Sequence, residues 1–301
     1  MKLPLKGIIP PMITPLTEDG KLDKKGLTNL IDHLITGGVH GIFLLGTNGE
    51  APSLCYELRK ELITESCKLV AKRILVLVGI TDTSFDGSIE IAEHAKEAGA
   101  DAVVIAPPYY MPISQSEMVE YLEELVPKLL LPFIMYNMPS CTKMHLTLDT
   151  IKRSKELGAI GIKDSSGDVG YFYALIEEFK NDPNFSLITG TEMFLPETIM
   201  YGGDGAVAGG ANFFPRLFVD LYDASVANDT ETIARLREKV LKLYDTIYDT
   251  GEFVSRFIKG TKSALKALGV CEDYMAMPLR NFDDENRAII KKYVEEYEYT
   301  H

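Results

Sequence analysis

The feature that most constrains the fold is a joint that recurs along the chain, in which a helical stretch ends in glycine and a short apolar run follows. Four clear examples read GGVHGIFLLGTNGE, AGADAVVIAPPYY, LGAIGIKDSS and GGDGAVAGGAN. Glycine suits the left-handed position just after a helix. A short, continuous apolar run is typical of a strand buried on both faces of a parallel sheet. The repetition therefore predicts strands and helices that alternate around one parallel sheet.

With the other short apolar runs added to these four, eight strands are predicted, and helical patterns separate them. The strands span Gly7–Ile13, Gly41–Gly46, Ile74–Ile80, Ala102–Ala106, Pro132–Asn137, Ala159–Lys163, Phe185–Thr189 and Gly205–Ala208. The clearest helical patterns span Asp23–Thr36, Tyr56–Ala71, Ser84–Ala98, Gln115–Val126 and Leu148–Leu157. Eight β/α units over about 225 residues match the count and length of an α/β fold, the (β/α)8 or TIM barrel. The alternative is a doubly wound sheet, which usually has a glycine-rich phosphate turn after its first strand. Here that turn reads IIPPMITPLTEDG, without the GxGxxG pattern.

The last quarter of the chain shows helical periodicity and no strand pattern. Three helices are predicted there, over Asp229–Tyr248, Val254–Leu268 and Asp283–Tyr297. We expect a barrel catalytic domain in residues 1–226 and a C-terminal helical appendage in residues 227–301.

The charge and the cysteines restrict the partners and the compartment. A net charge of −13 and a pI of about 4.9 argue against nucleic acid and anionic membranes, which attract clustered Lys and Arg. The stretch MKLPLKGIIPPMITPL is broken by prolines and does not have the pattern of an export signal. The longest apolar run, Leu129 to Met135, is too short to cross a bilayer. Four scattered cysteines are typical of reduced thiols, so we expect a cytoplasmic protein.

Lys163 is the strongest candidate for chemistry, because it ends the sixth predicted apolar strand. In barrel enzymes the active site lies at the C-terminal ends of the strands. An amine attacks a carbonyl only when it is neutral, and an apolar wall such as Ile160 and Ile162 favours the neutral form. Lys163 is therefore a candidate Schiff-base lysine. The alternatives are a lysine that extends to solvent or one that pairs with Asp164.

Other strand ends contribute phenols, a hydroxyl and free backbone N–H groups. Tyr136 follows the fifth strand and could relay protons beside an amine, although a core aromatic is the alternative. Tyr109 and Tyr110 follow the fourth strand. The turn Gly46–Glu50 contains Asn-Gly, a hairpin signal, but a helical pattern follows it. A turn before a helix presents N–H groups that suit a carboxylate, and Thr47 adds a hydroxyl.

Phosphate and metal sites are weaker interpretations. The stretch GGDGAVAGGAN at the eighth strand could bind a phosphate, or it could allow close packing of the strand against its helix. The histidines show no metal-ligand spacing. We therefore expect neither a metal nor a cofactor.

Taken in order, the motifs GTNGE, PPYY, YNMPS, GIKDSSGD and GGDGAVAGGAN resemble the dihydrodipicolinate synthase / N-acetylneuraminate lyase family of class I aldolases. The resemblance runs from about residue 6 to about residue 222. It implies a (β/α)8 barrel with C-terminal helices, assembled as a homotetramer of tight dimers. It also implies that pyruvate, or the pyruvoyl end of a 2-oxo acid, is held as a Schiff base on Lys163 and reacts with an aldehyde, without a metal or cofactor.

The resemblance implies roles for five further residues. Tyr136 would donate and accept protons, and Thr47 would link it to Tyr110, lent by a neighbouring subunit. The substrate carboxylate would bind the N–H groups of Thr47 and Asn48. The carbonyl of Val207 would face the bound pyruvate.

Two departures from the family pattern bear on the substrate. Dihydrodipicolinate synthases usually have an arginine that binds the carboxylate of aspartate semialdehyde, where this chain has Cys141. A thiol cannot replace a bidentate guanidinium. Asn48 stands in place of the usual second threonine. We therefore favour an aldolase or lyase that acts on a 2-keto-3-deoxy sugar acid or a related hydroxylated 2-oxo acid.

Three further residues then become candidates for binding substrate. Ser165 and Glu192 could bind substrate hydroxyl groups, and Gly190 begins the loop that carries Glu192. Solvated loop residues are the alternative for Ser165 and Glu192. Three other functions stay open: dihydrodipicolinate synthase, a non-catalytic protein that binds 2-oxo acids, and a barrel enzyme with a phosphorylated substrate.

Overall fold

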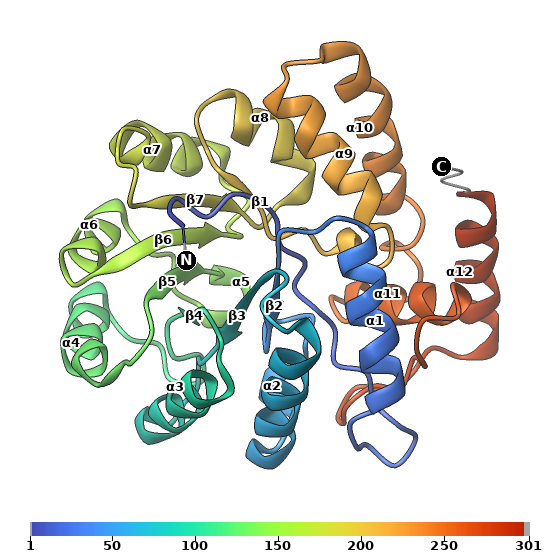
Figure 1. The fold of residues 1–301 in the computed structure, drawn as a ribbon, viewed down its shortest axis with the longest axis horizontal. Helices are drawn as coiled ribbons and strands as arrows, with labels where there is room; N and C mark the ends of the chain where they lie inside the picture. Colours follow the sequence, from blue (N-terminus) through green and yellow to red (C-terminus); the bar gives the residue numbers. More distant parts are fainter. Residues whose placement is uncertain (1, 298–301) are drawn as a thin grey trace.

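A sheet of eight parallel strands forms the centre of the molecule, and helices surround it (Figure 1). The computed structural model describes residues 2–297. The strands are β1 (Gly7–Ile8), β2 (Gly41–Leu44), β3 (Leu75–Gly79), β4 (Ala102–Ile105), β5 (Phe133–Asn137), β6 (Ala159–Asp164), β7 (Ser186–Thr189) and β8 (Gly205–Ala206). Their order is β1-β8-β7-β6-β5-β4-β3-β2, so from β2 to β8 each strand lies beside the next one along the chain, and β1 lies beside β8. The predicted (β/α)8 barrel with C-terminal helices is confirmed.

The first strand is much shorter than the predicted Gly7–Ile13, and proline is the physical reason. Backbone pairing with β8 continues to the bond from Ile9 N–H to Ala206 O and stops at Pro10 and Pro11, which have no N–H to donate. The chain then turns toward β2. Phe43 N–H donates to Pro10 O, and Met12 N–H donates to Phe43 O, each at 2.9 Å. These two bonds close the barrel.

The helices of the β/α units lie outside the strands, and side-chain caps fix where several of them begin. They are α1 (Lys24–Thr36), α2 (Tyr56–Val70), α3 (Phe85–Ala98), α4 (Gln115–Leu125), α6 (Leu148–Glu156), α7 (Val169–Phe179), α8 (Leu195–Met200) and α9 (Pro215–Val226). A further short helix, α5 (Pro139–Thr142), lies in the loop after β5. The side chains of Asp23, Ser84, Ser114, Thr147 and Asp168 accept hydrogen bonds from the first turns of α1, α3, α4, α6 and α7.

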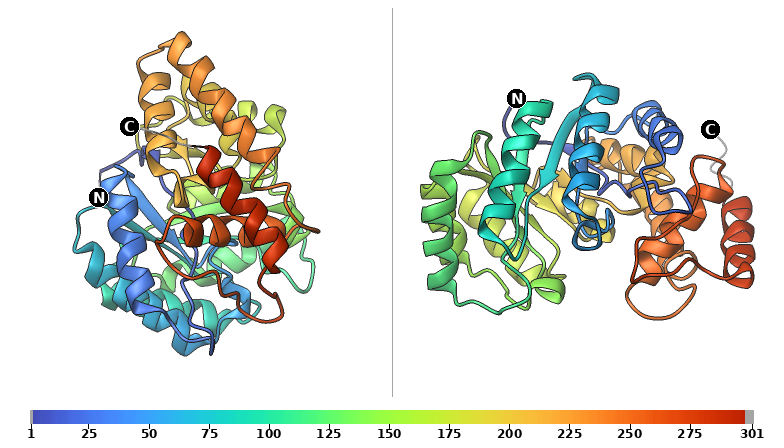
Figure 2. Two further views of the ribbon diagram at one scale, coloured as in Figure 1. Left: turned by 90° about the vertical axis from the view of Figure 1, so that its right-hand side faces the viewer. Right: turned by 90° about the horizontal axis from the view of Figure 1, so that it is seen from below.

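Three helices follow the barrel and lie together at one side of it, as Figure 2 shows. They are α10 (Thr230–Tyr244), α11 (Arg256–Ala267) and α12 (Asp284–Glu296), each slightly shorter than predicted. Helix α10 packs on α9, and α11 packs on α12. The division into domains at residues 226 and 227 stays a prediction.

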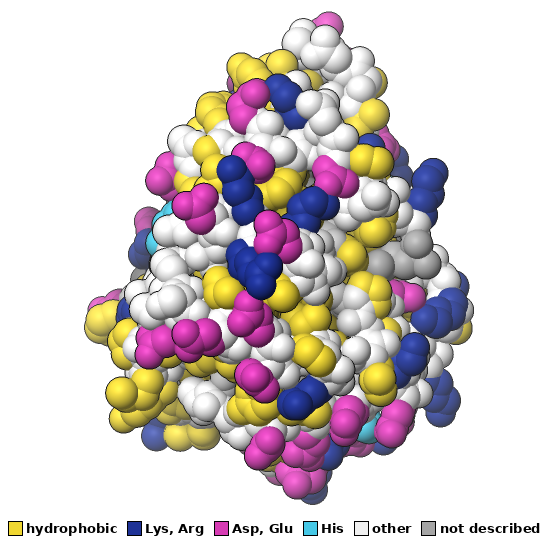
Figure 3. Space-filling model, turned by 90° about the vertical axis from the view of Figure 1, so that its left-hand side faces the viewer, with side chains coloured by type: hydrophobic (Ala, Val, Ile, Leu, Met, Phe, Trp, Pro, Cys, Tyr) yellow, Lys and Arg dark blue, Asp and Glu magenta, His cyan; other side chains and the backbone are white. Residues whose placement is uncertain are grey.

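The surface formed by the helices of the barrel carries charges of both signs. On the face shown in Figure 3, Lys and Arg side chains are interspersed with Asp and Glu. Ion pairs join neighbouring helices of the barrel, such as Arg153 with Glu123 and Lys152 with Glu178, each at 2.8 Å. Within residues 2–297 no helix is long and apolar enough to cross a membrane.

Candidate active site

A cavity of about 310 Å³ lies where the C-terminal ends of the strands meet the C-terminal helices. Its walls come from the loops after β2, β5, β6, β7 and β8 and from the segment 244–258. Eight of the nine residues predicted from the sequence line it: Thr47, Asn48, Tyr136, Lys163, Ser165, Gly190, Glu192 and Val207. The structure thus brings together side chains that are up to 160 positions apart in the sequence (47 to 207).

Lys163 is buried beside two aromatic rings, with 5% of its surface exposed. Its Nζ lies 3.8 Å from the centre of the Tyr136 ring and 5.0 Å from that of Phe43. Asp164 is not its partner, because that carboxylate accepts hydrogen bonds from Asn137 Nδ2 at 2.8 Å and Ser166 Oγ at 2.9 Å. Both ordinary interpretations of this lysine, extension to solvent and pairing with Asp164, are therefore wrong.

The register of β5 and β6 explains why Tyr136 and Lys163 meet. In the parallel ladder Tyr136 is the partner of Lys163, and Asn137 is the partner of Asp164. Successive side chains of a strand point to opposite faces. The hydrogen bond between Asn137 and Asp164 therefore fixes the register on one face while Tyr136 and Lys163 face the cavity on the other.

The turn Gly46–Glu50 places Thr47 and Asn48 at the cavity. The turn leads through η1 (Ala51–Ser53) into α2, so the helical continuation is confirmed and a hairpin is excluded. Thr47 Oγ1 and the Tyr136 hydroxyl are 3.5 Å apart, at the long limit of a hydrogen bond. Neither the Thr47 nor the Asn48 N–H group donates a hydrogen bond within residues 2–297. The turn can therefore offer two N–H groups to an anion.

Tyr110 is the predicted site residue that the single chain does not bring to the cavity. It is 80% exposed. Its neighbour Tyr109 lines a second cavity of about 250 Å³, which shares Thr47 and Tyr136 with the first and also contacts Cys141. A tyrosine–threonine–tyrosine chain of hydroxyl groups is thus incomplete within one copy.

Glu192 is buried and is not a solvated loop residue. It begins η3 (Glu192–Phe194), is 3% exposed, and its Oε2 accepts a hydrogen bond from Gly210 N–H at 2.8 Å. Its Oε1 is buried without a well-aligned hydrogen-bond partner, although the Tyr248 and Tyr244 hydroxyl groups interact with the carboxyl group. Burial raises the pKa of Glu192 to about 7, and the N–H groups of Gly210 and Gly209 oppose this shift.

Ser165 lies on the adjacent wall, and a glycine makes room for it. A side chain at Gly190 would place its Cβ 1.9 Å from Ser165 Oγ, so only glycine fits there without movement of the serine. Both residues line the cavity. Their substrate contacts stay predictions.

Tyr244, Tyr248, Phe257 and Ile258 line the cavity and were not predicted from the sequence. Tyr244 and Tyr248 are four residues apart at the end of α10 and just after it, the spacing of one helix face. That spacing was the available signal, but nothing in the sequence indicates that this face covers the barrel mouth.

The loop after β8 does not offer a free phosphate cradle. The N–H of Gly210 already binds the Glu192 carboxyl group. When it is ionised, the Glu192 carboxylate at this position repels a phosphate. No group of three His, Cys, Asp or Glu side chains within residues 2–297 is arranged to hold a metal ion.

The raised pKa of Glu192 makes the stability of the protein depend on pH. Between its ordinary value of 4.5 and about 7, the folded protein keeps a proton that the unfolded chain has released. Stability therefore falls as the pH rises through this window, by up to about 1.4 kcal/mol per pH unit. We expect the free energy of unfolding of the wild type, relative to Glu192→Gln, to fall by about 2 to 3 kcal/mol from about pH 5 to about pH 8.

Urea denaturation at several pH values measures this difference. The exposed Glu120 on α4 provides the control, because Glu120→Gln should differ from the wild type by an amount that hardly depends on pH. If the free energy of unfolding of the wild type minus that of Glu192→Gln stays constant across this pH window, the pKa of Glu192 is not raised in the folded protein.

Comparison with known proteins places the chain in one family. The model of the dihydrodipicolinate synthetase family matches residues 4–297. The Escherichia coli K12 protein named Probable 2-dehydro-3-deoxy-D-pentonate aldolase YjhH is 35% identical over 283 residues, which are 93% of each chain. The structure of dihydrodipicolinate synthase from Bacteroides thetaiotaomicron has 46% identity and a TM-score of 0.95, covering 98% of this chain and 100% of that one. Escherichia coli K12 YagE, solved in complex with pyruvate, has 32% identity and a TM-score of 0.92, covering 98% of this chain and 99% of its own.

These matches extend over almost the whole chain, and the family resemblance of the sequence motifs is confirmed. The relatives include sugar-acid aldolases as well as dihydrodipicolinate synthases. The protein is an aldolase-type lyase of the dihydrodipicolinate synthetase family.

Proposed function

We propose that the protein holds pyruvate, or the pyruvoyl end of a 2-oxo acid, as an imine on Lys163 and cleaves or forms the C3–C4 bond of a 2-keto-3-deoxy sugar acid. The observation that carries this proposal is the buried amine of Lys163, which meets aromatic rings and no carboxylate within the described residues. Imine formation needs a free amine as the nucleophile, and the Lys163 amine makes no ion pair within residues 2–297. The pyruvate complex of YagE supports the same ligand for this chain.

The steps balance without a redox partner. The Lys163 amine adds to the C2 carbonyl, and loss of water leaves an imine. The imine withdraws electrons from C3, so the C3–C4 bond breaks when the C4 hydroxyl loses its proton. An aldehyde leaves, the enamine takes a proton at C3, and water releases pyruvate. Tyr136 carries the protons of imine formation, since its ring is 3.8 Å from Nζ and its hydroxyl is 3.5 Å from Thr47 Oγ1.

The two ends of the cavity suit the two ends of such a substrate. The free N–H groups of Thr47 and Asn48 bind the carboxylate of the pyruvoyl end, and the carbonyl of Val207 faces it. At the other end Glu192, Ser165 and the C-terminal tyrosines donate and accept hydrogen bonds to hydroxyl groups. A protonated Glu192 carboxyl group can both donate and accept such bonds.

A dihydrodipicolinate synthase is the second candidate, favoured by the 46% identity to the Bacteroides thetaiotaomicron structure. Its second substrate, aspartate semialdehyde, carries a carboxylate that requires a cation. The position of the usual arginine holds Cys141, which lines the neighbouring cavity. Glu192 would repel a second carboxylate when it is ionised. These two residues lead us to prefer the sugar acid.

We also propose a cytoplasmic homotetramer built from dimers, in which Tyr110 of one copy reaches Thr47 of the next. The exposure of Tyr110 (80%) and of Met111 (69%) supports this arrangement. Large exposed apolar side chains that adjoin one another often mark an interface.

The substrate preference is tested with the purified protein and two reactions. We expect it to release pyruvate from 2-keto-3-deoxygluconate or the corresponding pentonate with a kcat/KM at least about 100-fold above that for condensing pyruvate with aspartate semialdehyde. Lactate dehydrogenase and NADH detect the pyruvate, and Lys163→Met is the blank. Condensation of pyruvate with aspartate semialdehyde, without release of pyruvate from either sugar acid, would indicate a dihydrodipicolinate synthase instead. An imine adduct with neither reaction would instead indicate a 2-oxo-acid-binding protein.

A further inference from the structure

A buried ion pair connects the carboxylate-binding turn to the C-terminal helices. Lys262 on α11 is 0% exposed, and its Nζ lies 2.5 Å from Glu50 Oε2. Glu50 is the last residue of the turn Gly46–Glu50 and its side chain is 1% exposed. It does not line the 310 Å³ cavity. Glu50 lines the neighbouring 250 Å³ cavity together with Thr47, and it is connected to the 310 Å³ cavity through the backbone of the turn.

Each member of the pair also binds the segment between α11 and α12. Lys262 Nζ donates to Tyr274 O at 2.6 Å, and Glu50 Oε1 accepts from Ala276 N–H at 2.8 Å. The Glu50 carboxylate thus binds residues 262 and 276, which both lie more than 200 positions away from it in the sequence. Burial lowers the pKa of Lys262, and the neighbouring Glu50 carboxylate opposes this shift.

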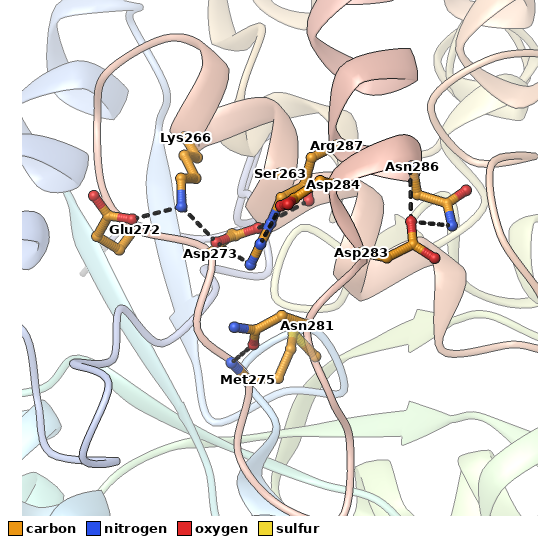
Figure 4. A network of polar contacts seen from close by, with 10 residues as sticks. All are labelled: Ser263, Lys266, Glu272, Asp273, Met275, Asn281, Asp283, Asp284, Asn286 and Arg287. Carbon is orange, nitrogen blue, oxygen red and sulfur yellow. Dashed lines mark hydrogen bonds and ion pairs between the residues drawn. The ribbon is translucent and has the colours of Figure 1, made fainter.

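The segment that receives these bonds is itself held firmly, as Figure 4 shows. The Asp273 carboxylate is buried and accepts hydrogen bonds from Lys266 Nζ on α11 and from Arg287 Nε on α12. Met275 N–H donates to Asn281 Oδ1 at 2.9 Å. The anchor for Glu50 is therefore a braced loop between two helices.

The turn needs such an anchor because its backbone is unfavourable by itself. Glu50 has φ +57°, in the left-handed region that a side chain disfavours. Thr14 Oγ1 donates a hydrogen bond to Gly49 O at 2.7 Å, which ties the turn to the segment after β1. Thr47 and Asn48 directly precede these two attached residues.

We propose that Glu50 and Lys262 are positioning residues that set the turn, so that the Thr47 and Asn48 N–H groups face the substrate carboxylate. This inference rests on the proposed imine chemistry. It gives the C-terminal helices a role in binding the 2-oxo acid, in addition to closing the cavity with Phe257 and Ile258.

The test compares pyruvate with acetone, which has a methyl group in place of the carboxylate. Adducts on Lys163 are reduced with cyanoborohydride and counted by mass, and the ratio of the two trapping rate constants is the readout. We expect Lys262→Met and Glu50→Gln to lower the pyruvate-to-acetone ratio at least about tenfold, with acetone trapping unchanged. The acetone rate also reports the fraction of folded, reactive protein, so poor folding cannot imitate the effect.

A double variant separates positioning from stability. Each single variant leaves one buried charge unpaired, whereas Glu50→Gln/Lys262→Met leaves none. We expect its thermal midpoint to recover toward the wild type while its pyruvate-to-acetone ratio stays low. A ratio that recovers together with stability would show that the pair is only structural.

Lys72→Met is the matched control. Lys72 Nζ also binds a carboxylate, Asp101 at 3.0 Å, and a backbone carbonyl, Gly99 at 2.6 Å, before the start of β4 at the other end of the barrel. Its ratio should equal that of the wild type. If the wild type, Lys262→Met and Glu50→Gln have equal pyruvate-to-acetone ratios, the positioning role is wrong while the proposed function still stands. Absence of any pyruvate adduct on wild-type Lys163 overturns the proposed function and this inference with it.

Discussion

Lys163→Met is expected to abolish the borohydride-trapped pyruvate adduct and to lower kcat of the aldol reaction by about 10⁴- to 10⁶-fold. Methionine keeps the length and the apolar stem of lysine and removes the amine. The remaining cavity can still bind the carboxylate and bring hydroxyl groups near the substrate. Without the amine, however, no covalent electron sink forms, and the C3–C4 bond must break from the free ketone.

The same change should not harm the fold. Nζ of Lys163 is buried and makes no ion pair within the described residues, so an apolar replacement leaves no orphaned charge behind. We expect the thermal midpoint of Lys163→Met to equal or exceed that of the wild type. This separates loss of chemistry from loss of structure.

Lys155→Met is a control for the aromatic contact. Lys155 Nζ also lies over a ring, that of Phe185 at 5.3 Å, but it belongs to α6 outside the barrel mouth. Its adduct formation should match the wild type. An adduct of normal yield in Lys163→Met, mapped to another lysine, would show that the reactive amine has been misassigned.

The barrel could be predicted from the sequence because each β/α unit carries its own local signal. A buried apolar run depends on neighbours in the chain, and in four of the eight units a glycine that ends the preceding helix strengthens the signal, so the units together predict the architecture. The length of β1 was predicted wrongly because two local signals conflict in this segment. Ile8, Ile9, Met12 and Ile13 form an apolar pattern, but the prolines between them prevent a continuous ladder.

The centre of the candidate site could be located for the same reason. Lys163 and Tyr136 end neighbouring strands, so strand order alone places them side by side. Tyr244 and Tyr248 could not be located, because they reach the cavity by packing of α10 against the barrel, which no local pattern encodes. The burial of Glu192 depends on the same packing. Whether Tyr110 joins the site depends on a second copy of the chain.

Tyr136→Phe is expected to slow imine formation with pyruvate by about two to four orders of magnitude. The change removes the hydroxyl and keeps the ring, so the contact of Lys163 Nζ with the ring and the edge-to-face contact with Phe43 remain. Carbinolamine formation and loss of water each move a proton between nitrogen and oxygen. The hydroxyl, next to Thr47 Oγ1, is the acidic group placed to carry it.

Rapid quenching with borohydride at saturating pyruvate measures this rate, and the end point of the same experiment gives a second criterion. A proton relay lowers the barrier and leaves the equilibrium between free pyruvate and imine unchanged. The slow variant should therefore reach the wild-type amount of adduct in the end. Tyr121→Phe is the control, since Tyr121 also donates through its hydroxyl, to Ser88 at 3.3 Å, between α3 and α4. A normal rate in Tyr136→Phe would remove Tyr136 from the mechanism, whereas a reduced end point would mean that it binds pyruvate instead of relaying protons.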